Sequence, residues 1–163
     1  MENIYFAKIK KNAKIPTKRE EDGAFDLYAC FYEDYMMIEP FTSKLIPTGI
    51  ASAFSDNYVA VFRERGSTGI KNIKINAGVV DSGYRDEWFV LLYNANDIPL
   101  FIAKNPNHVK AKYSYGIIYP YEKAIAQFLL IETPKAKIVE KSYEELLKVK
   151  SERGLGKLGS SGK

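Results

Sequence analysis

The sequence predicts an all-β domain, built as a sandwich or a barrel. Short apolar segments alternate with turn-forming residues along most of the chain, a pattern typical of many short strands. Tyrosine (12 residues) and phenylalanine (9 residues) are abundant, and aromatic side chains favour strands. Only one segment has the spacing of a helix. The 163 residues suffice for one domain with a sizeable core.

Strands are expected wherever an apolar run lies between turn signals. The expected strands cover residues 3–9, 44–54, 58–64, 73–80, 87–94, 98–103, 115–119, 124–132 and 136–141. The one short helix should begin after Ser142, because Glu145 stands where it would close a capping box. Its apolar face would carry Tyr143, Leu146, Leu147 and Val149.

The composition excludes several classes of protein. The net charge of +4 is mild and does not by itself argue for nucleic acid. Cys30 is the only cysteine and His108 the only histidine, so a disulfide framework and a multi-histidine metal site are excluded. Nothing resembles a signal peptide or a membrane span. We therefore expect a cytoplasmic protein that contacts neither a membrane nor nucleic acid directly.

The domain organisation is simple. Residues 1–150 should form a single β domain, with residues 105–114 as a loop inserted between two strands. Residues 151–163 are rich in glycine and have no apolar stripe, so this segment cannot bury enough surface to fold alone. We expect it to be a flexible C-terminal arm.

The segment "GVVDSGYRDE", residues 78–87, has the pattern of a hairpin with an acid at its entrance and a ring at its tip. Asp81 ends an apolar strand, Ser82 and Gly83 suit a turn, and Tyr84 follows. A carboxylate held at the lip of a pocket can act as a general base on water. The alternative is an ordinary turn with no chemical role.

Two further segments carry groups that suit phosphate oxygens. In "ERGSTGIK", residues 64–71, Arg65 precedes two glycines and two hydroxyl residues. The spacing is not that of a P-loop, and a plain loop remains an alternative. The arm repeats the chemistry with Arg153, Ser160 and Ser161.

Two polar residues lie in apolar strand-like segments. Asp26 is in "GAFDLYA" and Gln127 is in "AIAQF". A buried carboxylate is costly unless it is paired, so Asp26 should face a cation or support a metal. A buried amide must be hydrogen-bonded, and Gln127 should bond either to the main chain or to an ordered water.

Taken in order, these five segments resemble the five motifs of the trimeric dUTP diphosphatase (dUTPase) family, over residues 23–162. The resemblance implies a jelly-roll-like β-sandwich and the hydrolysis of dUTP to dUMP and pyrophosphate. That reaction keeps uracil out of DNA and supplies dUMP for thymidylate synthesis. The resemblance further implies a homotrimer with shared active sites and an arm that closes over the nucleotide as a lid.

The resemblance also assigns roles to residues near the sugar and the α-phosphate. Asp81 resembles the catalytic aspartate that activates the attacking water, and Gln127 the glutamine that helps to position it. Tyr84 resembles the tyrosine packed on deoxyribose. The main chain around Gly78 and Val80 would contact the uracil edge.

The remaining roles concern the phosphates and Mg²⁺. Arg65, Gly66 and Ser67 match the phosphate-contacting second motif, and Asp26 matches the aspartate that supports the arginine network and, through water, Mg²⁺. The lid residues by resemblance are Arg153, Leu158, Gly159, Ser160 and Ser161.

The sequence departs from the family pattern at three positions. Gly66 replaces a serine, Asp86 replaces a glycine, and Leu158 replaces the aromatic residue that stacks on uracil. Asp tolerates a positive φ better than most residues, should the turn need one. Leucine keeps apolar contact but loses ring stacking, so we expect weaker lid closure and a higher KM.

Other functions remain as alternatives. A dCTP deaminase shares the fold but places a catalytic glutamate three residues before an asparagine; the corresponding position before Asn94 is Leu91, which argues against deamination. A nucleotide-dependent regulatory module of phage type would use residues 105–114 to bind a host protein, and inserts of this kind fit a phage or prophage origin. A purely structural protein would need none of these polar residues.

Overall fold

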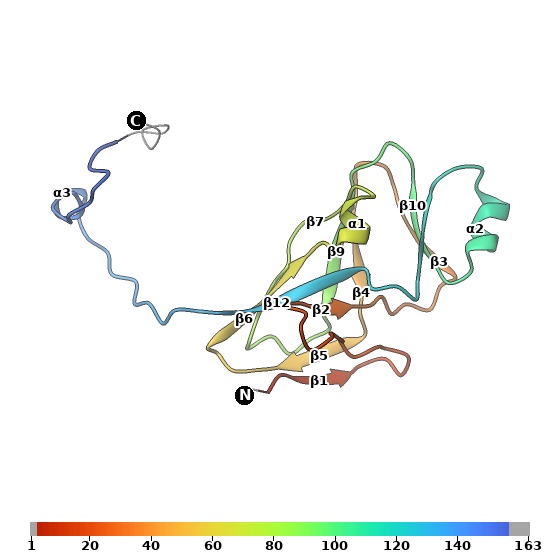
Figure 1. Ribbon diagram of the computed structural model, residues 1–163, viewed down its shortest axis with the longest axis horizontal. Helices are drawn as coiled ribbons and strands as arrows, with labels where there is room; N and C mark the ends of the chain where they lie inside the picture. Colours follow the sequence, from red (N-terminus) through yellow and green to blue (C-terminus); the bar gives the residue numbers. More distant parts are fainter. Residues whose placement is uncertain (1–2, 157–163) are drawn as a thin grey trace.

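The computed structural model describes residues 3–156. Strands dominate this part of the chain, and they form four small sheets rather than a closed barrel. The sheets have the strand orders β1-β5, β11-β10-β3, β2-β12-β6-β8 and β4-β9-β7. Figure 1 shows them packed together as one body, with the chain after β12 leading away from it. The prediction of an all-β domain is confirmed.

The strand bounds are as follows. The twelve described strands are β1 (Tyr5–Lys8), β2 (Phe25–Leu27), β3 (Tyr35–Ile38), β4 (Ser43–Pro47), β5 (Ile50–Ala53), β6 (Tyr58–Arg63), β7 (Ile73–Ile75), β8 (Val79–Asp81), β9 (Phe89–Asn94), β10 (Leu100–Ala103), β11 (Ile117–Pro120) and β12 (Ala126–Glu132).

Aromatic side chains fill the centre of the core. Trp88 is fully buried, and its ring centroid lies 5.3 Å from the centroids of Phe6, Phe62 and Phe128. These rings come from the segment before β9 and from β1, β6 and β12, so one cluster joins three of the sheets. The abundance of phenylalanine in the sequence is thus used for packing between sheets.

Two expected strands are each split by a change in backbone direction. The run 44–54 divides into β4 and β5 because Gly49 adopts φ +71°, where a Cβ would lie 2.9 Å from Ala13 Cβ. The run 73–80 divides into β7 and β8 around Ala77, whose φ is +139°. Apolar periodicity does not reveal such breaks, because it reports burial and not φ.

The other differences concern short or exposed segments. Residues 136–141, expected as a strand, have no regular structure, so that prediction was wrong. Strands β2 and β3 were not in the expected set, although the segment holding Asp26 was interpreted as strand-like. Three and four residues are too few to show a clear period.

The described chain has three short helices, where the sequence predicted one. The expected helix is α3 (Tyr143–Leu147), and Ser142 and Glu145 form the predicted capping box. The others are α1 (Gly66–Gly69) and α2 (Pro106–Lys112). Helix α2 lies inside residues 105–114, so the segment expected to be a loop is a capped helix between β10 and β11. The helix begins after Asn105, whose side chain accepts a hydrogen bond from the main-chain N–H of Asn107.

The chain beyond β12 leaves the body after Lys135, which pairs with Asp56 at 2.7 Å. Residues 134–156 are exposed throughout, including every residue of α3, and Figure 1 shows α3 standing apart from the sheets. The apolar face predicted for α3 therefore covers nothing within the described chain. No helix among residues 3–156 is long and apolar enough to cross a membrane.

Candidate active site

The first part of the candidate site is a pocket of about 320 Å³ beside β8. Its walls are mostly apolar and come from β4, β6, β8 and β9, with the turn after β8 at its lip. The lining residues are Leu45, Phe62, Ala77, Gly78, Val79, Val80, Asp81, Tyr84, Phe89 and Leu91. The structure therefore brings together four of the residues that the sequence singled out: Gly78, Val80, Asp81 and Tyr84.

Gly78 lets the main chain lie close to the floor of this pocket. Its carbonyl accepts a hydrogen bond of 2.7 Å from the Phe62 N–H. A Cβ on Gly78 would lie 2.6 Å from Phe62 Cβ, a distance that real side chains do not show. Ala77, next to it, has a φ of +139°, which is strained for a residue with a side chain. The main chain here is tightly held and forms one edge of the pocket.

Asp81 and Tyr84 lie at the lip. Asp81 is exposed at the end of β8, and its carbonyl accepts a hydrogen bond of 3.0 Å from the Tyr84 N–H. The Tyr84 hydroxyl donates to the Glu87 carbonyl at 3.1 Å, which holds the ring in place. Arg85 adds a hydrogen bond to the Ser82 carbonyl. The carboxylate of Asp81 and the fixed ring of Tyr84 thus lie at one opening, as the sequence pattern of residues 78–87 predicted.

The geometry of this turn differs from the predicted hairpin. β8 pairs with β6, whereas β9 pairs with β4 and β7, so the two strands belong to different sheets. The pocket lies between these sheets. Asp86 does not adopt a positive φ; its carboxylate accepts from the Glu87 N–H at 2.7 Å.

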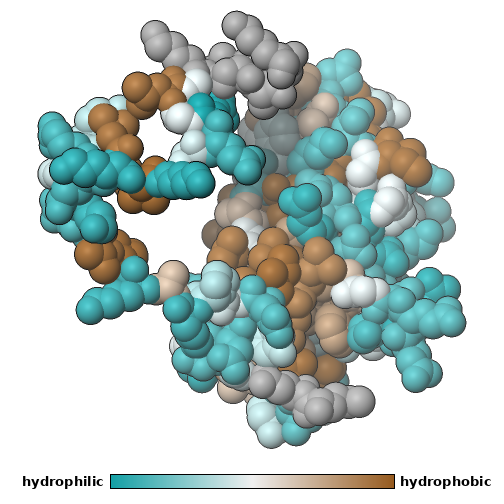
Figure 2. Space-filling view, turned by 60° about the vertical axis from the view of Figure 1, so that its left-hand side comes forward, coloured by the Kyte–Doolittle hydropathy of each residue, from teal (hydrophilic) through white to brown (hydrophobic). Residues whose placement is uncertain are grey.

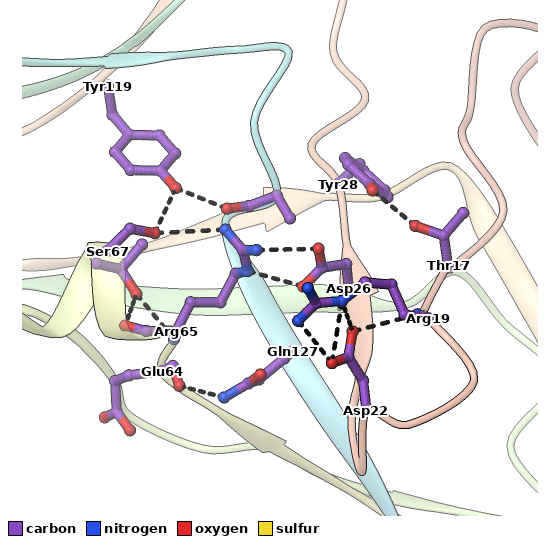
Figure 3. A network of polar contacts seen from close by, with 12 residues as sticks. Thr17, Arg19, Asp22, Asp26, Tyr28, Glu64, Arg65, Ser67, Tyr119 and Gln127 are labelled. Carbon is purple, nitrogen blue, oxygen red and sulfur yellow. Dashed lines mark hydrogen bonds and ion pairs between the residues drawn. The ribbon is translucent and has the colours of Figure 1, made fainter.

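The second part of the candidate site is the polar network of Figure 3. Arg65, at the start of α1, binds Asp26 of β2 through two hydrogen bonds, Nε to Oδ1 at 2.7 Å and Nη2 to Oδ2 at 3.0 Å. Its Nη1 also donates to Ser67 Oγ at 3.3 Å. Burial lowers the pKa of Arg65, but Asp26 and Tyr119 together outweigh burial, and the pKa is raised. The expected pairing of Asp26 with a cation is confirmed.

The loop that carries Arg65 is more ordered than a plain loop. The Thr68 hydroxyl accepts from the Arg65 N–H at 3.0 Å and donates to the Arg65 carbonyl at 2.9 Å. Ser67 Oγ lies 3.5 Å from the Tyr119 hydroxyl, which in turn donates to the Ala124 carbonyl at 2.7 Å. Tyr119 could not be found from the sequence, because it belongs to β11 and reaches the loop only in the folded chain.

Gln127 joins this network through its amide nitrogen. Nε2 donates to the Glu64 carbonyl at 2.8 Å, so the main-chain alternative is realised for that atom. Within the described chain the amide oxygen accepts no hydrogen bond. The Glu64 carboxylate accepts from the Ile75 N–H at 3.0 Å, and this bond lowers the pKa of Glu64. Glu64 is a linking residue that sequence reasoning did not assign.

The two parts do not meet in one chain. On β6, Val59 pairs with Asp81 and Arg63 pairs with Gln127. The two pairs lie four residues apart along β6, which corresponds to about 13 Å. The side chains of Asp81 and Gln127 point to the same face of the sheet, because directly paired residues share a face. A single chain therefore does not hold one water between Asp81 and Gln127.

The face between the two parts is apolar and open. Val59, Val61, Val79, Leu129 and Ile131 share it by register. Val79 is 68% exposed and Ile131 is 43% exposed. Figure 2 views the molecule from the side where the arm leaves, and it shows an apolar area on the body there.

The lid residues cannot all be located. Arg153 is exposed, and its Nε donates to the Gly156 carbonyl at 3.2 Å. Leu158, Gly159, Ser160 and Ser161 lie outside the described residues.

No group of three or more His, Cys, Asp or Glu side chains in residues 3–156 could hold a metal ion by itself. Both oxygens of Asp26 are engaged by Arg65, but each carboxylate oxygen can accept a further bond. This donor set fits Mg²⁺ that is held mainly by water and by substrate phosphates, as is usual for this ion.

Comparison with known proteins agrees with this geometry. The family model for dUTPase matches residues 11–107. A deoxyuridine 5'-triphosphate nucleotidohydrolase of Nautilia profundicola is 32% identical over 160 residues, covering 96% of each chain. The Pol polyprotein of caprine arthritis encephalitis virus is 26% identical over 150 residues, which are 92% of this chain but only 12% of that protein.

Solved structures show the same fold. A dUTPase of Staphylococcus bacteriophage 80alpha, with dUpNHpp, has a TM-score of 0.72 and 20% identity over 99% of each chain. A dUTPase from phage phi11 of S. aureus, which coordinates a structural Mg(II) ion, has a TM-score of 0.62 and 19% identity over 86% of this chain and 99% of that one.

Proposed function

Because this chain belongs to the dUTPase family, we propose that it hydrolyses dUTP to dUMP and pyrophosphate. The observation that carries the proposal is the pocket beside β8, where Asp81 and Tyr84 share the lip of an apolar cavity. The expected use of this reaction is to keep uracil out of DNA and to supply dUMP for thymidylate synthesis.

In the proposed reaction, the nucleoside enters the pocket and Tyr84 packs against its deoxyribose. The main chain at Gly78 and Val80 contacts the uracil edge. The Asp81 carboxylate takes a proton from a water as its oxygen attacks the α-phosphorus, and the bond from that phosphorus to the pyrophosphate oxygen breaks. We propose that the amide oxygen of Gln127 from a second copy of the chain accepts a hydrogen bond from this water.

The phosphates need positive charge. Arg65 supplies a fixed guanidinium, with Gly66 and Ser67 beside it, and Asp26 orients that guanidinium through two hydrogen bonds. Arg153 and the lid residues Leu158, Gly159, Ser160 and Ser161 are proposed to close over the triphosphate. Mg²⁺, supported by Asp26 through water, would offset the charge of the phosphates.

We further propose that the active unit is a homotrimer with shared sites. Asp81 and Gln127 are separated by about 13 Å along β6 in one chain, so a site that uses both needs two copies. The apolar face between them is open for a second copy, and we propose that the exposed residues 136–156 extend to a neighbouring copy. Residues 1–150 then act as one β domain and 151–163 as the lid.

The test is a nucleotide panel. Purified protein with Mg²⁺ is incubated separately with dUTP, dCTP, dTTP and UTP, and both pyrophosphate and the base are identified. Pyrophosphate from dUTP alone is the expected result. Release of ammonia from dCTP would instead support a deaminase, although Leu91, an apolar wall of the pocket, stands where that enzyme needs a glutamate. Tight binding of dUTP without turnover would favour the regulatory function over the hydrolysis of dUTP.

A second candidate function is a regulatory interaction with a host protein. Helix α2 supports it, because it stands out between β10 and β11 and only Val109 is buried. His108, Lys110 and Lys112 are exposed on it. A pull-down with the intact protein and with a variant lacking residues 105–114 tests this role: a partner captured by both proteins would exclude the insert as its binding site.

A further inference from the structure

A second pocket, of about 570 Å³, lies apart from the proposed active site. It is formed by the turn after β1, the segment between β2 and β3, the end of β10 and the turn before β12. It shares no lining residue with the pocket that holds Asp81 and Tyr84. Its volume is in the range of small-molecule sites.

The charge on its walls is mainly positive. Four lysines line it: Lys10, Lys11, Lys14 and Lys104. Lys10 is paired with Glu87 at 2.8 Å, and Lys14 is paired with Glu122 at 2.5 Å. Lys11 and Lys104 have no carboxylate partner within the described residues. Two positive charges in one cavity are therefore not compensated.

The Lys104 ammonium is held in place rather than free to swing. It lies 5.3 Å from the ring centroids of both Phe31 and Tyr121 and donates to the Tyr32 carbonyl at 2.9 Å. The two rings are themselves packed edge to face, 4.9 Å apart. An ammonium carries three donors, so Lys104 keeps donors for a ligand while its position is already fixed.

The ion pair between Lys14 and Glu122 can also open to bind a ligand. The side chains of Lys14 and Glu122 are 44% and 73% exposed, and ion pairs with this exposure contribute little to stability. An anion with more than one negative charge can therefore replace Glu122 as the partner of Lys14 at a small cost in free energy. Lys11 is exposed at the same turn.

We propose that this pocket binds a multiply charged phosphate anion. The ligand is either free pyrophosphate or the phosphate tail of a nucleotide, which present the same oxygens to the lysines. The site is built from its own residues and does not depend on the proposed hydrolysis of dUTP.

Calorimetric titration tests the site. The wild-type protein, saturated with dUpNHpp to occupy the proposed active site, is titrated with pyrophosphate and separately with ATP. The expected result is one site per chain that is weakened at least about tenfold in Lys11→Gln/Lys104→Gln, as the loss of charge-assisted bonds implies. Tighter binding of ATP than of pyrophosphate would identify the nucleotide tail as the ligand.

Two lysines elsewhere provide the matched control. Lys74 and Lys110 are exposed and line neither pocket, so Lys74→Gln/Lys110→Gln removes the same charge and should bind as the wild type does. Equal weakening in both double variants, or no pyrophosphate binding by the wild type, would overturn the proposal. Binding of single-stranded DNA without binding of pyrophosphate would overturn it as well.

A milder variant guards against misfolding. Lys104 packs on two rings, so its replacement could disturb the fold. Lys11→Glu changes an exposed side chain that has no hydrogen bond or ion pair within the described residues, and the variant should fold normally. The Lys11→Glu variant is also expected to bind pyrophosphate more weakly. An unchanged affinity for pyrophosphate in a folded Lys11→Glu protein would contradict the proposed binding site.

Discussion

Arg65 and Asp26 form a two-point ion pair between the loop after β6 and strand β2, with N–O distances of 2.7 and 3.0 Å. The two side chains are 29% and 28% exposed, so the pair is shielded yet its outer edge is reachable. The pair fixes the plane of the guanidinium before any ligand arrives. Replacement of either partner would therefore change the orientation of the guanidinium.

Arg65→Lys should lower kcat/KM for dUTP by at least about tenfold, because an ammonium cannot bind Asp26 at two points and present a plane to phosphate. Steady-state kinetics measure the effect. Arg19→Lys is the matched control, since Arg19 forms a similar two-point pair with Asp22 that is 88% exposed on the arginine side. Equal losses in the two variants would remove Arg65 from phosphate binding.

Asp81→Asn should reduce turnover by about 10²- to 10⁴-fold, because an amide cannot take a proton from water. Binding of dUTP should persist, since the apolar walls of the pocket are unchanged. Single-turnover kinetics and calorimetry measure the two effects. Asp97→Asn, at an exposed position outside the pocket, should keep full activity. Strong residual turnover in Asp81→Asn would contradict the base role.

Deletion of residues 153–163 should greatly reduce turnover and leave the oligomer intact. Residues 153–156 are exposed, so their loss should change the melting temperature little. Activity assays and light scattering on the same samples measure both properties. A truncated protein with full activity would exclude the arm as a lid, whereas dissociation of the oligomer would show that it holds subunits together.

Gly78→Ala should destabilise the protein by about 1–3 kcal/mol, because its Cβ would overlap Phe62 in a packed region. Gly83→Ala is the control in the neighbouring turn: its Cβ would meet nothing within 4 Å. Urea unfolding measures both variants. Equal stability of the two would mean that the main chain at Gly78 can move away from β6, and that the pocket floor is softer than its contacts imply.

Glu64→Gln should lower stability at pH 7 by about 1 kcal/mol, because the bond from the Ile75 N–H to a charged carboxylate is stronger than to an amide. The pKa of Glu64 is lowered in the folded protein, so this stabilisation is present above the unfolded pKa and is lost as the pH falls through the folded one.

Urea unfolding of wild type and Glu64→Gln across pH 3–7 measures this dependence. The difference between them should shrink toward the acid end. Glu33→Gln, at an exposed site, should follow the wild type at every pH. A difference that stays constant with pH would assign the effect to packing rather than to charge.

The sequence predicted best those features that depend on residues close together in the chain. Asp81 and Tyr84 are three residues apart, so a short turn suffices to bring them to one lip. The capping box of α3 was predictable for the same reason, since Ser142 and Glu145 are one helical turn apart. The pairing of Asp26 also followed from its residue type, because an apolar setting demands a counter-charge.

Other features depend on contacts between distant segments. Tyr119 reaches Ser67 across 52 positions. The pocket walls Leu45 and Phe89 come from β4 and β9, two paired strands of a different sheet from β8. The splitting of β7 from β8 rests on a positive φ at Ala77, which no apolar pattern encodes. Helix α2 differs from the predicted loop because its sequence carries few apolar residues, and Val109 is its only buried residue.

By itself, then, the sequence determined an all-β fold and the order of the polar motifs, because strand periodicity and residue chemistry are properties of short segments. The tertiary structure decided how those motifs group. It set Asp81 with Tyr84 at one end of β6 and Gln127 with Arg65 at the other, because strand register, not sequence spacing, fixes which residues become neighbours. It also formed the lysine-lined pocket, since loops far apart in the chain meet only when the sheets pack.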